Sequence, residues 1–303
     1  MQIPEAKYLI INSLSGNGRG KKFASLISHS EVITGLKVSL PESLEEASKI
    51  YNDLNRSENH LMIAGGDGTF NSLINLVYPP YRFSISLIPT GSGNDLTKYF
   101  NIDNNPVDAL KASLEATDSI EMDIWDCRIT FADGKVEKKR FLNTSGLGFD
   151  AYVGTLKEKK KFLTGMTVYI ISLIQGLFSY SPVKYNLELS DGKSYKGTAM
   201  FITAGNGIFS GGGFRLTPTS KVDDGIVDIC IVENMSLPKI FKNLRKAITG
   251  KHLGLKEVTY LTTNSYTISL EEPAHLHLDG ETSTQLVNEF SLSLSPHKLK
   301  VII

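Results

Sequence analysis

The chain has 303 residues and equal numbers of acidic and basic side chains, so its formal net charge at pH 7 is zero. This balance gives no general electrostatic attraction to nucleic acid, and we expect no nucleic-acid partner. The composition is that of a globular protein long enough for two domains.

Strands and helices are predicted to alternate through residues 1–123, because short apolar runs are followed by segments with apolar residues at helical spacing. Such alternation is typical of parallel strands joined by crossover helices, so this part is predicted to be an α/β domain whose N-terminal residues lead into a first strand rather than form a signal peptide. The strands are expected at 7–12, 35–40, 60–64 and 84–88, and the helices at 19–29, 43–56, 69–78, 93–100 and 106–117.

Residues 124–303 change to apolar and polar alternation with a period of two, which predicts a mainly antiparallel sandwich or barrel with helices near 152–178 and 237–248. The final strand is expected to pack back near the N-terminal domain. The apolar segment 162–178 contains several polar side chains, so it is predicted to be a buried or surface-docked helix and not a membrane span. Cys127 and Cys230 are expected to be buried free thiols in a reducing cytoplasm.

A glycine-rich turn, AGGDGT, follows the predicted strand at 60–64 and precedes the helix at 69–78. Unpaired backbone N–H groups at a helix start attract an anion, and glycine lets a ligand approach the main chain. Asp67 would repel a phosphate directly, which indicates a cation such as Mg²⁺ between the two groups. The alternative is a structural turn in which Asp67 or Thr69 caps the helix.

Two more loops of this kind follow predicted strands. PTGSGND, residues 89–95, has Asn94 or Asp95 as a candidate helix cap, and NSLSGNGRGK, residues 12–21, offers hydroxyl groups and Arg19. The latter matches neither the Walker A spacing nor G-x-G-x-x-G. Because the carboxyl ends of parallel strands lie at one edge of a sheet, we expect all three loops to converge on one phosphate-binding site.

The order of six motifs resembles the diacylglycerol kinase catalytic-domain family. They are NSLSG, GGDGTFN, PTGSGNDL, the glycines at 211–213, DDGIVD and HLDGE, and together they span nearly the whole chain. GGDGT alone also resembles NAD kinases and phosphofructokinases, whereas GSGND and DGE are more specific to lipid kinases, in particular the bacterial soluble types similar to diacylglycerol kinase B and YegS. The resemblance implies an α/β N-terminal domain of the NAD kinase and diacylglycerol kinase type and a mainly antiparallel β-sandwich C-terminal domain for the lipid acceptor.

The resemblance also implies a nucleotide site, most of which lies in the three loops. Ser39, at the end of the second strand, loosely matches a position where the family usually has a nucleotide-contacting Thr. Ser13 stands where the family usually has Pro, which affects loop rigidity but removes no phosphate ligand. The implied cofactor-binding residues are Asn12, Ser13, Leu14, Ser15, Gly16, Ser39, Gly65, Gly66, Asp67, Gly68, Thr69, Phe70, Asn71, Ser92, Asn94 and Asp95.

The DGE motif at 279–281 follows a predicted strand and supplies two carboxylates. Phosphoryl transfer to an alcohol needs a group that accepts the hydroxyl proton. By resemblance Glu281 is that acceptor, and Asp279 is its partner or a metal ligand. Asp67 is the third predicted catalytic residue and would hold or orient the catalytic Mg²⁺. The alternative is a β-turn with solvated acids.

The segment KVDDGIVD, residues 221–228, resembles a second, structural Mg²⁺ site of the family. Carried over, Asp224 supplies its side chain while Lys221 and Ile226 supply backbone carbonyls, and hard cations favour such oxygen ligands. The alternative is a hairpin turn around Asp224, which is compatible with a bound metal.

Two further features have a functional and a structural interpretation. His275 and His277 alternate along one strand as a metal pair would, but no third His or Cys lies near them in sequence, so we expect them to pack or face solvent. Residues 157–161, KEKKK, precede Phe162 and Leu163 and could contact an anionic membrane surface. The alternative is a solvated helix end whose lysines cover the core.

These motifs predict an ATP-dependent lipid kinase that phosphorylates a hydroxyl of diacylglycerol or a related lipid, with ATP and Mg²⁺ as cofactors. The expected location is the cytoplasm, with transient peripheral contact at the inner face of the membrane, and a homodimer remains open. One alternative is an NAD kinase-like small-molecule kinase, which addition of NAD to a phosphorylation assay would reveal. The other is a catalytically inactive regulator, which would bind ATP or lipid without turnover.

Overall fold

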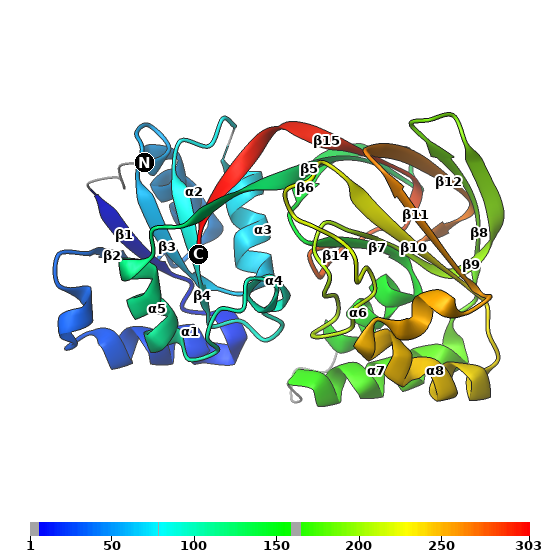
Figure 1. Cartoon of the computed structure of the whole chain (residues 1–303), viewed down its shortest axis with the longest axis horizontal. Helices are drawn as coiled ribbons and strands as arrows, with labels where there is room; N and C mark the ends of the chain where they lie inside the picture. The colour runs from blue at the N-terminus through cyan, green and yellow to red at the C-terminus, as the bar shows by residue number, and fades with distance from the viewer. Residues whose placement is uncertain (1–5, 78, 159–164) are drawn as a thin grey trace. The chain divides into compact units, whose positions relative to one another are not determined.

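The structure is a computed structural model that describes residues 6–77, 79–158 and 165–303. The chain divides into two compact units (Figure 1). The first consists of Met1–Ile124 and Pro296–Ile303, and the second of Trp125–Ser295.

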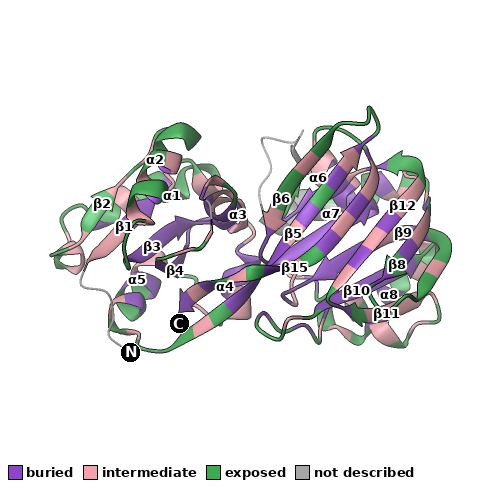
Figure 2. Cartoon of the chain, turned by 90° about the horizontal axis from the view of Figure 1, so that it is seen from above, coloured by how far each residue is buried: buried purple, intermediate pink, exposed green. Residues whose placement is uncertain are grey.

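The first unit contains a parallel sheet in the order β2-β1-β3-β4, to which the end of β15 adds another parallel strand beside β4. Strands β3 and β4 are buried along their whole length, as expected of central parallel strands covered on both faces (Figure 2). The bounds are β1 (Lys7–Ile11), β2 (Lys37–Ser39), β3 (His60–Gly65), β4 (Ser84–Pro89) and β15 (Val287–Ile302).

Helices alternate with these strands, which confirms the predicted α/β pattern. Phe23 and Ile27 of α1 and Leu110 of α5 pack with Leu9 and Met62 of the sheet in one apolar cluster. The helix predicted at 19–29 begins at Ser15 in the structure, but residues 16–18 have positive φ, so regular helical geometry begins only after them. The helices are α1 (Ser15–Ile27), α2 (Leu44–Leu54), α3 (Asp67–Leu76), α4 (Asp95–Tyr99) and α5 (Pro106–Glu115), with a short 3-10 helix η1 (Glu31–Ile33).

The second unit is built mainly from antiparallel strands, as predicted. Strand β9 pairs with β7, β8 and β10, and β12 pairs with β8 and β15. Trp125, Phe141 and Phe290 lie in the core that these strands enclose. The strands are β5 (Ser119–Phe131), β6 (Val136–Phe141), β7 (Thr144–Gly148), β8 (Val183–Leu189), β9 (Ser194–Gly205), β10 (Val227–Glu233), β11 (Val258–Thr263), β12 (Ser265–Ala274), β13 (Leu276–Leu278) and β14 (Glu281–Thr282).

Helices α6 (Phe149–Glu158), α7 (Gly165–Ser179) and α8 (Leu237–Thr249), with the 3-10 helix η2 (Lys251–Gly254), complete the second unit. Val153 of α6 and Leu173 of α7 belong to a second apolar cluster, against which Leu244 of α8 packs. Among the described residues, none of the helices combines the length and the apolar character that a membrane span requires. Cys127 and Cys230 are free thiols and are buried, as predicted.

Three strands of the second unit lack the period-two alternation on which the prediction of a β-rich domain rests. β6 carries four charged residues, β7 has the sequence TSGLG, and β14 is two residues long, so none of them shows an apolar run with strand periodicity. Their conformation comes from pairing, since β7 lies between β9 and β13 and β14 pairs with β13.

Candidate functional site

Three loops at the carboxyl edge of the parallel sheet are joined by side-chain hydrogen bonds. Asn12 Nδ2 donates to Thr69 Oγ1 at 2.9 Å, which connects the loop after β1 with the turn after β3. Ser15 Oγ lies 2.7 Å from Thr90 Oγ1, and Arg19 donates to the main-chain carbonyl next to Thr90, that of Gly91. The prediction that these loops meet at one edge of the sheet is confirmed.

Two glycines, Gly66 and Gly91, allow the main chain of the turn after β3 to contact the main chain of the turn after β4. A Cβ on Gly91 would lie 2.3 Å from the Cα of Gly66, and a Cβ on Gly66 would lie 2.7 Å from the Cα of Gly91. Thr90 and Gly91 also donate their N–H groups to the carbonyl of Gly65. Any side chain at 66 or 91 would therefore separate the two loops.

Asp67 begins α3, yet its carboxylate accepts hydrogen bonds from the start of another helix. Its Oδ2 accepts from the N–H of Asp95 at 3.0 Å and its Oδ1 from the N–H of Leu96 at 3.1 Å. These N–H groups belong to the first turn of α4, which has no intrahelical acceptor for them, so Asp67 caps a helix 28 positions further along the chain. The alternative in which Asp67 or Thr69 caps α3 is confirmed for Thr69, whose Oγ1 accepts the N–H of Gly66 at 3.4 Å.

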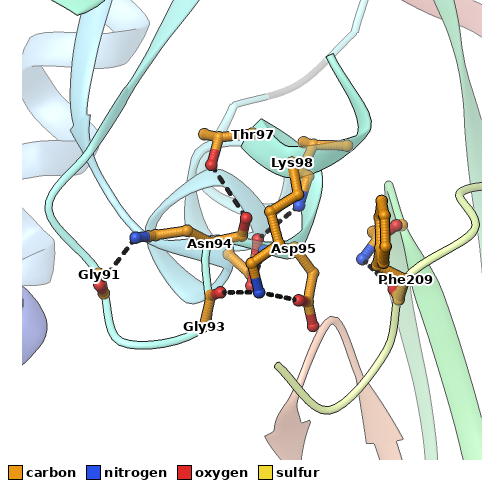
Figure 3. Close-up of polar contacts among 10 residues, drawn as sticks. Gly91, Gly93, Asn94, Asp95, Thr97, Lys98 and Phe209 are labelled. Atoms are coloured by element: carbon orange, nitrogen blue, oxygen red, sulfur yellow. Dashed lines mark hydrogen bonds and ion pairs between the residues drawn. The ribbon is translucent and has the colours of Figure 1, made fainter. Parts of the chain in front are cut away.

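The turn before α4 is itself tightly bonded (Figure 3). Asn94 adopts a left-handed conformation with φ of 52°, and its Nδ2 donates to the carbonyl of Gly91 at 2.9 Å. The buried carboxylate of Asp95 forms an ion pair with Lys98 at 2.9 Å. The two acidic residues at this edge, Asp67 and Asp95, thus both have cationic or N–H partners within the first unit.

The other predicted nucleotide-site residues differ in exposure. Leu14 and Ser92 are exposed at the loop tips, and Ser39 at the end of β2 is half-buried. Phe70 and Asn71 are buried on α3, so their side chains face the protein interior. Half-buried loop residues are Asn12, Ser13, Ser15, Gly16, Asp67, Gly68 and Thr69.

In the second unit, the turn at 279–281 joins β13 to β14. Asp279 is buried in a left-handed conformation with φ of 49°, and its two carboxylate oxygens accept the N–H groups of residues 142–144 at 2.8 to 3.0 Å. Glu281, by contrast, is exposed. The alternative of two solvated acids is therefore wrong for Asp279. Its hydrogen bonds connect the turn to residues 142–144, where β7 begins.

Asp150, which the sequence analysis did not single out, lies beside this turn. His277 Nδ1 accepts the N–H of Gly280 at 3.3 Å, so Nε2 carries the ring proton and donates to Asp150 Oδ2 at 3.3 Å. The expectation that the histidines pack is confirmed, because His277 is buried and the ring of His275 lies against an aromatic ring of α6. The only signal for Asp150 was its place after the glycines of GLGFD, which an unaligned sequence does not distinguish from an ordinary helix start.

An apolar cavity of about 100 Å³ lies next to Asp150 in the second unit. Its lining comes from α6, α7, α8, η2, β9, β10 and β11 with the loops next to them, and it includes Phe149, Leu173, Met200 and Leu244. The polar groups on it include Asp150 and His252, and burial lowers the pKa of His252 below its usual value. A mostly apolar wall with few polar groups is typical of a pocket for an apolar ligand.

The segment around Asp224 forms a turn and not a hairpin. Asp224 Oδ1 accepts the N–H of Ile226 at 3.0 Å just before β10, whose partners are β9 and β11. Lys221, Asp224 and Ile226 are all exposed. Within residues 6–77, 79–158 and 165–303, no three His, Cys, Asp or Glu side chains are grouped to hold a metal ion.

The α/β unit carries the linked glycine-rich loops, and the β-rich unit carries the acidic turn. Residues 7–127 match the family model "Diacylglycerol kinase catalytic domain", and residues 144–303 match the model "YegS C-terminal NAD kinase beta sandwich-like domain". The chain therefore belongs to the diacylglycerol kinase catalytic-domain family and has a YegS-like C-terminal β-sandwich.

Known relatives agree with this assignment. A diacylglycerol kinase of Bacillus subtilis (strain 168) is 28% identical over 235 residues, which cover 76% of this chain and 73% of the relative. One from Staphylococcus aureus (strain JH9) is 29% identical over 239 residues, or 78% and 72% of the two chains.

Solved structures share the fold over nearly the whole chain. A diacylglycerol kinase from Bacillus anthracis str. Sterne covers 98% of this chain and 96% of its own, with a TM-score of 0.74 and 22% identity. An NAD kinase from Archaeoglobus fulgidus in complex with ATP covers 98% and 93%, with a TM-score of 0.52 and 14% identity.

Proposed function

We propose that this chain transfers the γ-phosphoryl group of ATP to a hydroxyl of diacylglycerol or a related lipid. The observation that carries the proposal is the meeting of three glycine-rich loops at one sheet edge, with the Asp67 carboxylate among them. Loop N–H groups suit phosphate oxygens, and a carboxylate suits the accompanying cation. The relatives named diacylglycerol kinase support a lipid as the acceptor.

The donor set at this edge fits Mg²⁺. The carboxylate oxygens of Asp67 are hard ligands of the kind that Mg²⁺ prefers, and they lie between the turn after β3 and the start of α4. We assign Asp67 to orient the ion that accompanies ATP, with Asp95 assisting. When bound, Mg²⁺ would offset the negative charge of the phosphoryl group during transfer.

We assign Glu281 as the group that accepts the proton of the lipid hydroxyl. It is exposed, and it stands two residues after the buried Asp279, whose bonds to residues 142–144 fix the turn. In this proposal Asp279 is a positioning residue, because its oxygens already accept three main-chain N–H groups. Glu281 removes the proton and so raises the nucleophilicity of the attacking oxygen.

We place the apolar part of the acceptor in the cavity of the second unit, among Phe149, Leu173 and Met200. Burial of hydrocarbon there contributes binding free energy, while the neighbouring carboxylate of Asp150 offers a hydrogen-bond acceptor to a polar part of the lipid. The turn at 221–226 remains a proposed structural cation site, with the Asp224 side chain and the carbonyls of Lys221 and Ile226 as ligands.

Contact with a membrane follows from an acceptor that dissolves in bilayers. The basic segment 157–161 is one proposed contact: Lys157 is exposed at the end of α6, whereas Lys159, Lys160 and Lys161 lie outside the described residues. The cytoplasmic location, the peripheral association and a homodimer are part of the same proposal.

A single acceptor panel separates the proposal from its two rivals. The purified chain is incubated with γ-labelled ATP and Mg²⁺ together with diacylglycerol in detergent micelles, phosphatidylglycerol in the same detergent, a sphingoid base, or NAD. We expect label in a lipid product and none in NADP. Label in NADP alone would favour the NAD kinase-like alternative, and ATP binding without a labelled product from any acceptor would favour the inactive regulator.

A further inference from the structure

Helices α7 and α8 present an apolar and basic face to solvent on the second unit. On α7, Ile171, Ile174 and Phe178 follow one another at helical spacing on the exposed side, and Phe178 is 72% exposed. On α8, Phe241 and Ile248 are 46% and 47% exposed. Large apolar side chains gathered in this way mark an interaction surface.

The opposite sides of the same two helices line the apolar cavity. Leu173 of α7 and Ile240, Leu244 and Ala247 of α8 face it. Helices α7 and α8 lie in the same layer of the second unit (Figure 1). Their inner sides contact one cavity, so their exposed residues lie on the sides that face away from it. Only the thickness of these helices separates the solvent-exposed apolar residues from the proposed lipid pocket.

The charge of this face has one sign. Helix α7 contains no charged residue, and no Asp or Glu occurs from residue 234 to residue 256. Lys242, Arg245 and Lys246 are exposed on α8 beside Phe241 and Ile248. Interleaved apolar and basic side chains on the outer side of a helix are typical of segments that lie in the interface of an anionic bilayer.

We propose that this α7–α8 face, made of Ile171, Ile174, Phe178, Phe241 and Ile248 with Lys242, Arg245 and Lys246, docks on a bilayer that contains anionic lipid. Its purpose, delivery of the acceptor to the cavity behind it, rests on the proposed function. The docking itself does not, since it depends only on apolar and charged groups at the surface. This face differs from the basic segment 157–161 and supplies the apolar contact that a lysine run lacks.

Sedimentation with sucrose-loaded vesicles tests the proposal without ATP. The full chain is compared on vesicles of phosphatidylcholine alone and on an equimolar mixture with phosphatidylglycerol. We expect binding mainly to the mixture, and a decrease of the partition coefficient by about tenfold in the double variant Phe178→Ser, Phe241→Ser. The triple variant Lys242→Gln, Arg245→Gln, Lys246→Gln should lose the preference for phosphatidylglycerol.

Matched controls on the same unit separate the face from general surface effects. Val136→Ser with Leu286→Ser removes two other exposed apolar side chains, and Lys184→Gln with Lys193→Gln and Lys196→Gln removes three other exposed lysines. Both controls should bind vesicles as the unaltered chain does. The melting temperature of every variant is measured, so that loss of folding is not counted as loss of docking.

A second measurement uses a variant that keeps a large apolar side chain on the α7–α8 face. Trp125 is the one tryptophan and is fully buried, so Phe178→Trp adds a surface reporter. Its emission should shift to shorter wavelength when mixed vesicles are added, and the unaltered chain should show no comparable shift. An unchanged emission maximum, or equal vesicle binding by the double, triple and control variants, would overturn the proposal.

Light scattering tests the alternative that a second copy of this chain, and not a bilayer, binds the α7–α8 face. A concentration-dependent dimer that the double variant Phe178→Ser, Phe241→Ser abolishes, with vesicle binding unaffected, would also overturn bilayer docking. Phosphorylation of detergent-dispersed diacylglycerol is assayed separately and should be unchanged in both α7–α8 variants. Loss of vesicle binding with retained phosphorylation concerns the face alone, and absence of phosphorylation in the unaltered chain concerns the proposed function alone.

Discussion

Asp67 and Asp279 each bind backbone N–H groups of a segment distant in the sequence. Asp67 caps α4, and Asp279 accepts from residues 142–144. In both motifs the sequence identified the carboxylate but not its partners, because these hydrogen bonds form only after the chain folds. The same side chains therefore have a structural effect that must be separated from any chemical one.

For Asp67 the separation uses two substitutions. Asp67→Ala removes both acceptors from the start of α4 and should cost about 1–2 kcal/mol of stability, whereas Asp67→Asn keeps one amide oxygen as acceptor and should cost less. Neither supplies a charge for Mg²⁺, so both should lose nearly all lipid phosphorylation. Thermal unfolding and initial rates are measured together, with Asp108→Asn in the first turn of α5 as control. Near-normal activity of Asp67→Asn would show that the charge of Asp67 is not needed for turnover.

The two carboxylates of the acidic turn should respond in opposite ways. Asp279→Ala leaves the three N–H groups of residues 142–144 without this acceptor and should lower the free energy of unfolding by about 3 kcal/mol or more. Glu281→Gln changes an exposed side chain and should leave the melting temperature unaltered while kcat falls by about 10²–10⁴-fold. A Glu281→Gln enzyme with an unaltered kcat on its true acceptor would remove Glu281 from the role of proton acceptor.

At the scale of elements, strand β3 carries a buried histidine that makes the first unit sensitive to acid. Burial, together with the nearby charge of Lys7, lowers the pKa of His60 from 6.5 to about 4, and the ring bonds to Ser86 Oγ at 2.9 Å. The unfolded chain then binds a proton more readily than the folded one, so the stabilisation is complete above pH 6.5 and is lost as the pH falls toward 4. The full effect corresponds to roughly 3 kcal/mol.

Denaturant unfolding at several pH values between 4 and 7 measures this effect. The unaltered chain should lose more stability over that range than His60→Gln, which keeps a hydrogen-bonding side chain but has no group that titrates there. Parallel curves for the two proteins would mean that His60 is not protonated preferentially in the unfolded state.

Elements were predictable where their own residues determine them. Strands β3 and β4 are continuous apolar runs that the sheet buries on both faces, and α2 begins with Ser43 accepting the N–H of Glu46, a cap that is visible in the sequence. Strand β7, TSGLG, has no such property and is extended because β9 and β13 pair with it. The turn before β10 was open to a hairpin interpretation because sequence does not show which strand lies next to which.

At the scale of the whole molecule, the order of the motifs was enough to predict the family. The fold and the comparisons agree with that prediction. The sequence also located the edge where the glycine-rich loops gather, because the carboxyl ends of parallel strands must share it. It did not reveal the cavity beside Asp150, whose lining comes from helices, strands and loops far apart in the chain. The exposed residues of α7 and α8 were equally hidden, since an apolar helix sequence does not show which side faces solvent.

The measurement that tests the central claim most directly is the formation of phosphatidic acid from diacylglycerol by the purified full chain. Diacylglycerol is supplied in detergent micelles with ATP and Mg²⁺, and the lipid product is identified by mass spectrometry. We expect product that depends on ATP, on Mg²⁺ and on Asp67, with ADP formed in equal amount. ADP release with no phosphorylated lipid, or product formation at the same rate by Asp67→Ala, would contradict the account.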